Sequence, residues 1–132
     1  MSIPRRNNRL SRATLAEGKW AQSEANRLRR QIIDFTGAHA GSIPKCEAME
    51  RKHLDKLRDY RVQLAAGAQY DRGGAPLSEC IRAEWSRLKY VRRTIANDRE
   101  TVAILRRHVA QWEGIVADIE GARKVFDQGP LL

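Results

Sequence analysis

The fold is decided by one stretch, residues 77–127, which reads LSECIRAEWSRLKYVRRTIANDRETVAILRRHVAQWEGIVADIEGARKVFD and contains no proline. Gly114 and Gly121 are its only glycines, and each costs only about 1 kcal/mol inside a helix. The stretch therefore predicts one helix of about 50 residues, which would be about 75 Å long.

Apolar residues recur every seven positions along this stretch, a spacing that is typical of a coiled coil. One core position holds Ile81, Leu88, Ile95, Val102, Val109 and Val116, and the other holds Leu77, Val91, Leu105, Trp112, Ile119 and Phe126. Glu84 and Asp98 interrupt the second series. Polar core residues of this kind typically fix register or partner, and we expect each acid to receive an arginine from a neighbouring helix.

Two shorter helices are predicted before the long one, at about residues 14–36 and 44–66. Thr14 and Glu17 fit a capping box, and Gly37 suits a left-handed helix end. Pro44 suits the first helical position, with Ser42 or Ile43 as the cap. The expected apolar faces are Ala21, Ala25, Leu28, Ile32 and Phe35 in the first helix and Cys46, Met49, His53, Leu57, Tyr60 and Leu64 in the second.

No segment alternates with the period of two that a half-buried strand needs. The predicted fold class is therefore all-α, with the long C-terminal helix packed antiparallel on two shorter N-terminal helices. The predicted organisation is a basic tail at residues 1–13, a single helical domain at 14–127 and a short tail at 128–132.

Two arrangements are compatible with the helix lengths: the short helices line the long one in succession, or they bundle beside half of it. The second arrangement leaves residues 102–126 with a bare apolar stripe, which demands a partner. We assign to this interface Val102, Leu105, Val109, Trp112, Val116, Ile119 and Phe126. Even in the first arrangement the apolar side chains of Trp85 and Ile115 lie beside the seam and would be exposed in a monomer. A homo-oligomer, which would bury them, is therefore expected.

Composition excludes several classes of protein. The 132 residues are 42% hydrophobic and 31% charged, with a formal net charge of +9. The sequence has neither a membrane-length apolar run nor the hydrophobic segment of a secretory signal, so the expected location is the cytoplasm and no membrane partner is expected. The arginines at 5, 6, 9 and 12 also fit an organellar transit peptide. Cys46 and Cys80 give neither a disulfide framework nor zinc spacing.

Arginines supply the candidate binding surface. Arg92, Arg99 and Arg106 share one heptad position on the long helix, with Arg93 and Arg107 beside them, and we call these five the arginine ladder. Because a guanidinium pairs bidentately with phosphate oxygens, the ladder could follow a nucleic-acid backbone. The alternative is that these arginines pair with Glu47, Glu50, Asp55 or Asp59 of the second helix.

The basic N-terminal tail is a second candidate. Arg5, Arg6, Arg9 and Arg12 lead into a helix that carries Arg27, Arg29 and Arg30. Arginine-rich segments can fold on RNA or lie along DNA, and Trp20 could stack on a base. The alternative is a solvated tail and a tryptophan that packs on the helices.

No catalytic residue, metal ligand or cofactor is predicted. Cys46, Glu50 and His53 share one helix face and could form a thiolate or metal site, but they are more simply read as seam residues, with Glu50 salt-bridged at the edge. The loop between the first two helices, residues 37–43, is too long for a helix-turn-helix reader of DNA.

The predicted function is non-enzymatic binding of DNA or RNA through backbone contacts by an oligomeric helical protein. The alternative is a coiled-coil adaptor, stalk or inhibitor that docks on an acidic protein surface. In outline the chain resembles the small DNA-packaging subunits of tailed phages, and equally the coiled-coil stalk proteins of bacterial secretion ATPases. The resemblance implies a DNA-handling assembly in the first case and a secretion-type assembly in the second.

Overall fold

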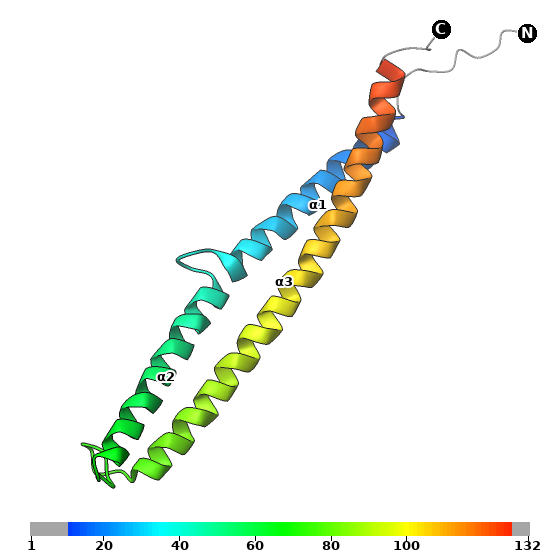
Figure 1. Cartoon of the computed structure of the whole chain (residues 1–132). Coiled ribbons are helices and arrows are strands. Elements are labelled where there is room, and N and C mark those ends of the chain that lie inside the picture. The colour runs from blue at the N-terminus through cyan, green and yellow to red at the C-terminus, as the bar shows by residue number, and fades with distance from the viewer. Residues whose placement is uncertain (1–10, 128–132) are drawn as a thin grey trace, which may run out of the picture. The chain divides into compact units, whose positions relative to one another are not determined.

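A computed structural model describes residues 11–127, except for the side chains of Phe126 and Asp127. It contains three helices, α1 (Arg12–Thr36), α2 (Ser42–Ala65) and α3 (Leu77–Asp127) (Figure 1). These residues form no strand, and Tyr70 and Pro76 make only an isolated bridge. The predicted all-α fold with a long third helix is confirmed.

α3 is one uninterrupted helix of 51 residues. Its buried apolar residues all belong to the predicted heptad core: Leu77, Leu88, Val91, Ile95, Val102 and Val109. Half-buried at the same two heptad positions are Ile81, Leu105, Trp112, Val116 and Ile119. The seven-residue repeat therefore identifies the face of α3 that packs on the other helices.

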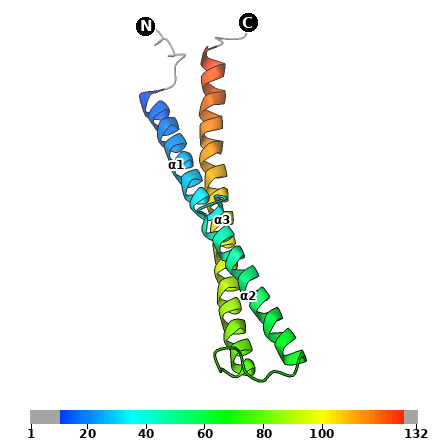
Figure 2. The same cartoon turned by 90° about the vertical axis from the view of Figure 1, so that its left-hand side faces the viewer.

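The chain divides into two compact units, and α3 contributes to both. One unit joins the described residues up to Ile32 with the described residues from Ile104 onward, and the other is Ile33–Ala103. α2 thus packs on the first half of α3 and α1 on the second half, as the ribbon shows (Figure 2). The short helices line the long one in succession, and the alternative in which both bundle beside half of it is wrong.

Within the unit Ile33–Ala103, α2 runs antiparallel to α3. Two ion pairs and one hydrogen bond demonstrate the direction: Glu47 pairs with Arg99, Glu50 pairs with Arg92, and His53 is hydrogen-bonded to Glu84. The residue number falls along α3 as it rises along α2. Leu57 of α2 and Leu88 of α3 are among the buried side chains of this pair.

Within the other unit, α1 approaches α3 closely because its contact face is made of small residues. Ala21 and Ala25 are completely buried, and a Cβ atom at Gly18 would lie 3.3 Å from the Ile119 side chain. Trp20 meets Trp112 edge to face, with ring centroids 4.7 Å apart. Of the predicted apolar face of α1, Ala21, Ala25 and Leu28 are buried within this unit.

The start of α1 differs from the prediction. α1 begins at Arg12 rather than Thr14, and the Ser11 hydroxyl accepts a hydrogen bond from the Thr14 N–H at 3.1 Å. Ser11 is therefore the cap, and the predicted capping box of Thr14 with Glu17 is wrong.

The connection between α1 and α2 also differs. Gly37 does not have a positive φ, which among the described residues is found only at Gly67 and Gly74. α2 begins at Ser42, with Gly41 rather than Ser42 or Ile43 at the cap position. Pro44 lies at the third helical position instead of the first, and it is tolerated there because the first four N–H groups of a helix have no intrahelical acceptor.

Asp71 organises the loop between α2 and α3. Its carboxylate accepts hydrogen bonds from the N–H groups of Gly73 at 2.9 Å and Ala75 at 2.8 Å, and from the Cys80 thiol at 3.4 Å. The bond from Ala75, above all, holds the pKa of Asp71 below its ordinary value. Burial and the Asp71 carboxylate raise the pKa of Cys80, so this thiol remains protonated and acts as a donor.

Candidate nucleic-acid interface

Two members of the arginine ladder pair with acids of α2. Arg92 Nε lies 3.1 Å from Glu50 Oε2, and Arg99 Nη2 lies 3.9 Å from Glu47 Oε1. The intramolecular alternative therefore applies to these two arginines, although their side chains remain more than half exposed.

The other three members of the ladder are exposed and carry no such pair. No ion pair in the described part of the chain engages Arg93, Arg106 or Arg107. Arg93 belongs to the unit Ile33–Ala103, whereas Arg106 and Arg107 belong to the other unit. The structure thus separates the ladder into paired and available residues.

The arginines of the N-terminal region are divided in a similar way. Arg5, Arg6 and Arg9 lie outside the described residues, and Arg12 is exposed at the start of α1. Arg27 pairs with Glu24 on the same helix, where the hydrogen bond raises the pKa of Arg27 and lowers that of Glu24. Arg29 pairs with Glu113 of α3, so these two arginines are engaged within the chain.

Two of the apolar residues assigned to a partner interface contact α1 of the same chain: Trp112 meets Trp20, and Ile119 lies against Gly18. Val102 and Val109 are buried, while Leu105, Trp112, Val116 and Ile119 are half-buried. The side chain of Phe126 lies outside the described part. α1 thus covers part of this stripe within its own unit.

Three basic side chains lie around the carboxylate of the polar core residue Glu84. The carboxylate accepts hydrogen bonds from His53 Nδ1 at 2.6 Å and from Arg87 at 2.8 Å, and Lys56 Nζ lies 3.9 Å away. Burial raises the pKa of Glu84, but these hydrogen bonds and the positive charges of His53 and Lys56 outweigh burial, so the pKa lies below its ordinary value. The expected arginine from a neighbouring helix is wrong, because Arg87 belongs to α3 itself.

Asp98 is satisfied by a hydroxyl. The Ser42 hydroxyl, at the first position of α2, donates to Asp98 Oδ2 at 2.9 Å. The expected arginine partner is wrong here too. The Ser42–Asp98 bond instead ties the beginning of α2 to α3.

Two of the three side chains in the Cys46, Glu50 and His53 group have partners outside it. Glu50 pairs with Arg92 at the edge of the seam, as the seam interpretation predicts, and His53 pairs with Glu84. Over residues 11–127 no three His, Cys, Asp or Glu side chains are grouped as a metal site requires.

The structure reveals a basic–aromatic cluster that the sequence analysis missed, made of Arg58, Arg61, Arg82, Trp85 and Lys89. The guanidinium carbon of Arg61 on α2 lies 5.8 Å from the ring centroid of Trp85 on α3. The other three members are helical neighbours of this pair at spacings of three or four residues. All five side chains are exposed, and the ion pairs of the described residues leave Arg58, Arg82 and Lys89 without an acid.

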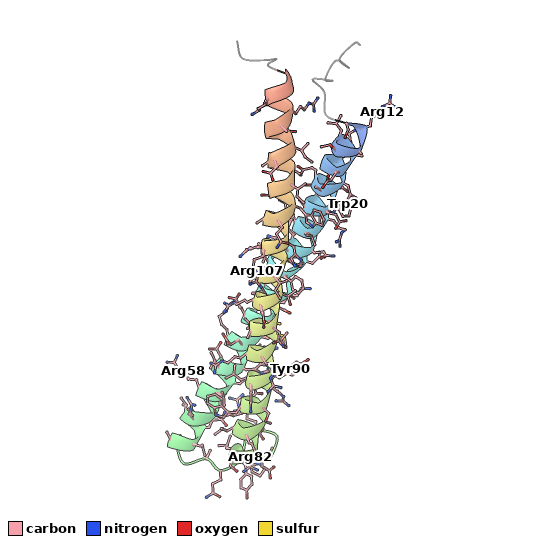
Figure 3. The ribbon with its side chains drawn as sticks, turned by 90° about the vertical axis from the view of Figure 1, so that its right-hand side faces the viewer. Arg12, Trp20, Arg58, Arg82, Tyr90 and Arg107 are labelled. Atoms are coloured by element: carbon pink, nitrogen blue, oxygen red, sulfur yellow. The ribbon has the colours of Figure 1, made fainter. Side chains whose placement is uncertain are left out.

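A different surface lies on the other side of the α2–α3 pair. Tyr90, 72% exposed, and Met49, 48% exposed, border an apolar groove together with His53 and Val91. Arg58 and Tyr90 project from opposite sides of the two helices (Figure 3). The α2–α3 pair thus carries the basic–aromatic cluster on one flank and, on the other, an apolar groove that Arg87 also borders.

Comparison with protein-family models, curated protein sequences and solved structures finds no match to this chain. None of the described helices has the length and apolar character needed to cross a membrane.

Proposed function

We propose that the protein binds nucleic acid, without catalysis, through contacts to the sugar–phosphate backbone. The observation that carries the proposal is the basic–aromatic cluster, in which Arg82 and Lys89 lie about one helical turn from Trp85, Arg58 lies about one turn from Arg61, and none of these three cations has an acid partner among the described residues. Backbone phosphates attract such groups independently of base sequence and release counterions on binding. The formal net charge of +9 favours the same class of ligand.

The arginine ladder and the N-terminal arginines belong to the same proposal. Arg12, Arg93, Arg106 and Arg107 are available for phosphate contacts in their respective units. Arg92 and Arg99 can also contribute, because an exposed ion pair is worth only about 0–1 kcal/mol and a phosphate can replace the glutamate. The proposal also includes Arg5, Arg6 and Arg9, which precede Arg12 in the sequence.

The test compares two variants that each lose three positive charges. Arg58→Gln/Arg82→Gln/Lys89→Gln removes the charge around Trp85, whereas Lys45→Gln/Lys52→Gln/Lys124→Gln removes exposed lysines elsewhere. Fluorescence anisotropy with labelled 20-nucleotide DNA and RNA is measured from low to high salt. We expect the cluster variant to bind at least about 10-fold more weakly, with a log–log salt slope smaller by about one per lost contact, and the control to change about 2-fold or less.

Light scattering on the same samples tests whether the protein also self-associates. We expect a mass above the 15.1 kDa of one chain, since Tyr90 and Met49 expose an apolar flank, and a further salt-sensitive increase on adding nucleic acid. The circular dichroism of both triple variants should match that of the wild type. Absence of any nucleic-acid binding at low salt contradicts the proposal and favours docking on an acidic protein surface.

A further inference from the structure

We infer that the basic–aromatic cluster is a site for single-stranded nucleic acid, in which one base stacks on the ring of Trp85 while Arg58, Arg82 and Lys89 hold the flanking phosphates. This inference rests on the proposed function and narrows its ligand. Every base offers a flat π face, so stacking on an aromatic side chain needs no particular sequence.

The position of Trp85 makes its ring available. Trp85 lies beside the α2–α3 seam and is 42% exposed, and Arg61 reaches across from α2 to the ring. The ring is thus held from both helices while part of it stays in solvent. Trp20 is 56% exposed, but its ring packs edge to face against another aromatic ring, that of Trp112, whereas the ring of Trp85 meets a cation.

The charges around Trp85 lie where a strand that passes over the ring needs them. Arg82 precedes Trp85 by three residues and Lys89 follows it by four, so one cation lies about a helical turn away on either side. Arg58 has the same relation to Arg61 on α2. Basic side chains that flank an exposed aromatic ring form the usual platform for unpaired strands.

A duplex cannot use the ring in this way. Its bases are stacked on one another, so a base must leave the stack at a cost of a few kcal/mol before an aromatic side chain can cover its face. The phosphate contacts, by contrast, are available in both forms of nucleic acid. Loss of the Trp85 ring is therefore expected to weaken binding of single strands and not of duplexes. Loss of the neighbouring cations is expected to weaken binding of both.

The experiment measures the Kd of 12-nucleotide oligothymidine and of a duplex of the same length by anisotropy. Trp85→Leu should weaken binding of the single strand by about 5- to 100-fold and leave duplex binding within about 2-fold. Trp85→Phe should recover most of the loss, because it restores an aromatic face. Tyr90→Leu is the matched control, since Tyr90 is an exposed aromatic residue of the same helix on the opposite flank, and neither affinity should change.

A second measurement needs no variant. Oligonucleotides that contain 5-bromodeoxyuridine are irradiated on the wild-type protein, and the cross-linked tryptic peptide is identified by mass spectrometry. We expect the cross-link on residues 83–87, the peptide that carries Trp85.

The outcomes distinguish the two proposals. Equal affinity changes for single strand and duplex in Trp85→Leu, or cross-links confined to other peptides, overturn the single-strand site while nucleic-acid binding stands. If the wild type binds neither oligonucleotide at low salt, the proposed function fails as well.

Discussion

Glu84 shows how a single buried charge links the stability of this protein to pH. Its side chain is 1% exposed, and its pKa in the folded state is lowered because hydrogen bonds and cations outweigh burial. An unfolded glutamate has a pKa of about 4.3. The carboxylate therefore stabilises the fold fully above that value, and this contribution is lost as the pH falls through the lower folded-state pKa.

Glu84→Gln should consequently lower the free energy of unfolding at pH 7 by about 1–3 kcal/mol, because His53, Arg87 and Lys56 lose their common acceptor. Urea denaturation at a series of pH values measures the effect. The difference from the wild type should narrow below about pH 4.3, where the wild-type carboxylate also becomes protonated.

Glu100→Gln provides the control for this prediction. Glu100 is exposed on the same helix and belongs to no ion pair of the described residues, so its substitution should change stability by less than about 0.5 kcal/mol. Equal stability of wild type and Glu84→Gln at pH 7 would show that the buried cluster contributes nothing to folding.

The sequence identifies Glu84 and Asp98 as polar core positions but does not identify their partners. Partner choice depends on the register between α2 and α3, which sequence periodicity leaves open. At the observed register His53 and Lys56 reach Glu84, and Ser42 reaches Asp98. The same uncertainty left two interpretations of Arg92 and Arg99, and only their distances to Glu50 and Glu47 identify the acids they contact.

At the scale of helices, the connection between α1 and α2 depends on Gly41. A Cβ atom there would lie 2.6 Å from both the N and O atoms of Gly37 and 2.7 Å from the Phe35 carbonyl oxygen. These are backbone atoms and cannot move without shifting the end of α1. Gly41 has an ordinary φ of −66°, so the requirement for glycine here is steric and not conformational.

Gly41→Ala should therefore destabilise the protein by about 1–3 kcal/mol, as overpacking typically does. Gly114→Ala should act in the opposite sense, because a Cβ at this position in α3 meets nothing within 4 Å and alanine favours the helix by about 1 kcal/mol. Thermal unfolding of both variants is the measurement. A stabilised Gly41→Ala would mean that the connection rearranges at little cost.

The helices themselves were predictable from sequence, but their ends were less so. The seven-residue repeat and the absence of proline are sufficient for α3. Near the start of α1, Ser11 and Thr14 are both good cap residues, and only the observed hydrogen bond identifies Ser11. The basic–aromatic cluster escaped prediction because Arg61 and Trp85 are far apart in sequence and meet only through the pairing of α2 with α3.

For the molecule as a whole, the two units differ in how far apart in sequence their contacting residues are. His53 and Glu84 are 31 positions apart, whereas Trp20 and Trp112 are about 90 apart. Loop-closure entropy favours the shorter segment by about 1 kcal/mol in an otherwise unfolded chain. We therefore expect α2 and the first half of α3 to pair before α1 docks.

Pulsed hydrogen exchange during refolding measures this order. Amides of α2 should gain protection before those of α1, and simultaneous protection of the two helices would contradict the expectation. A ribosome imposes the same order, because residues 104–127 are synthesised after all of Ile33–Ala103. The apolar face of α1 is synthesised before the residues of α3 that cover it, so a nascent chain exposes this face to solvent until residues 104–127 have been made.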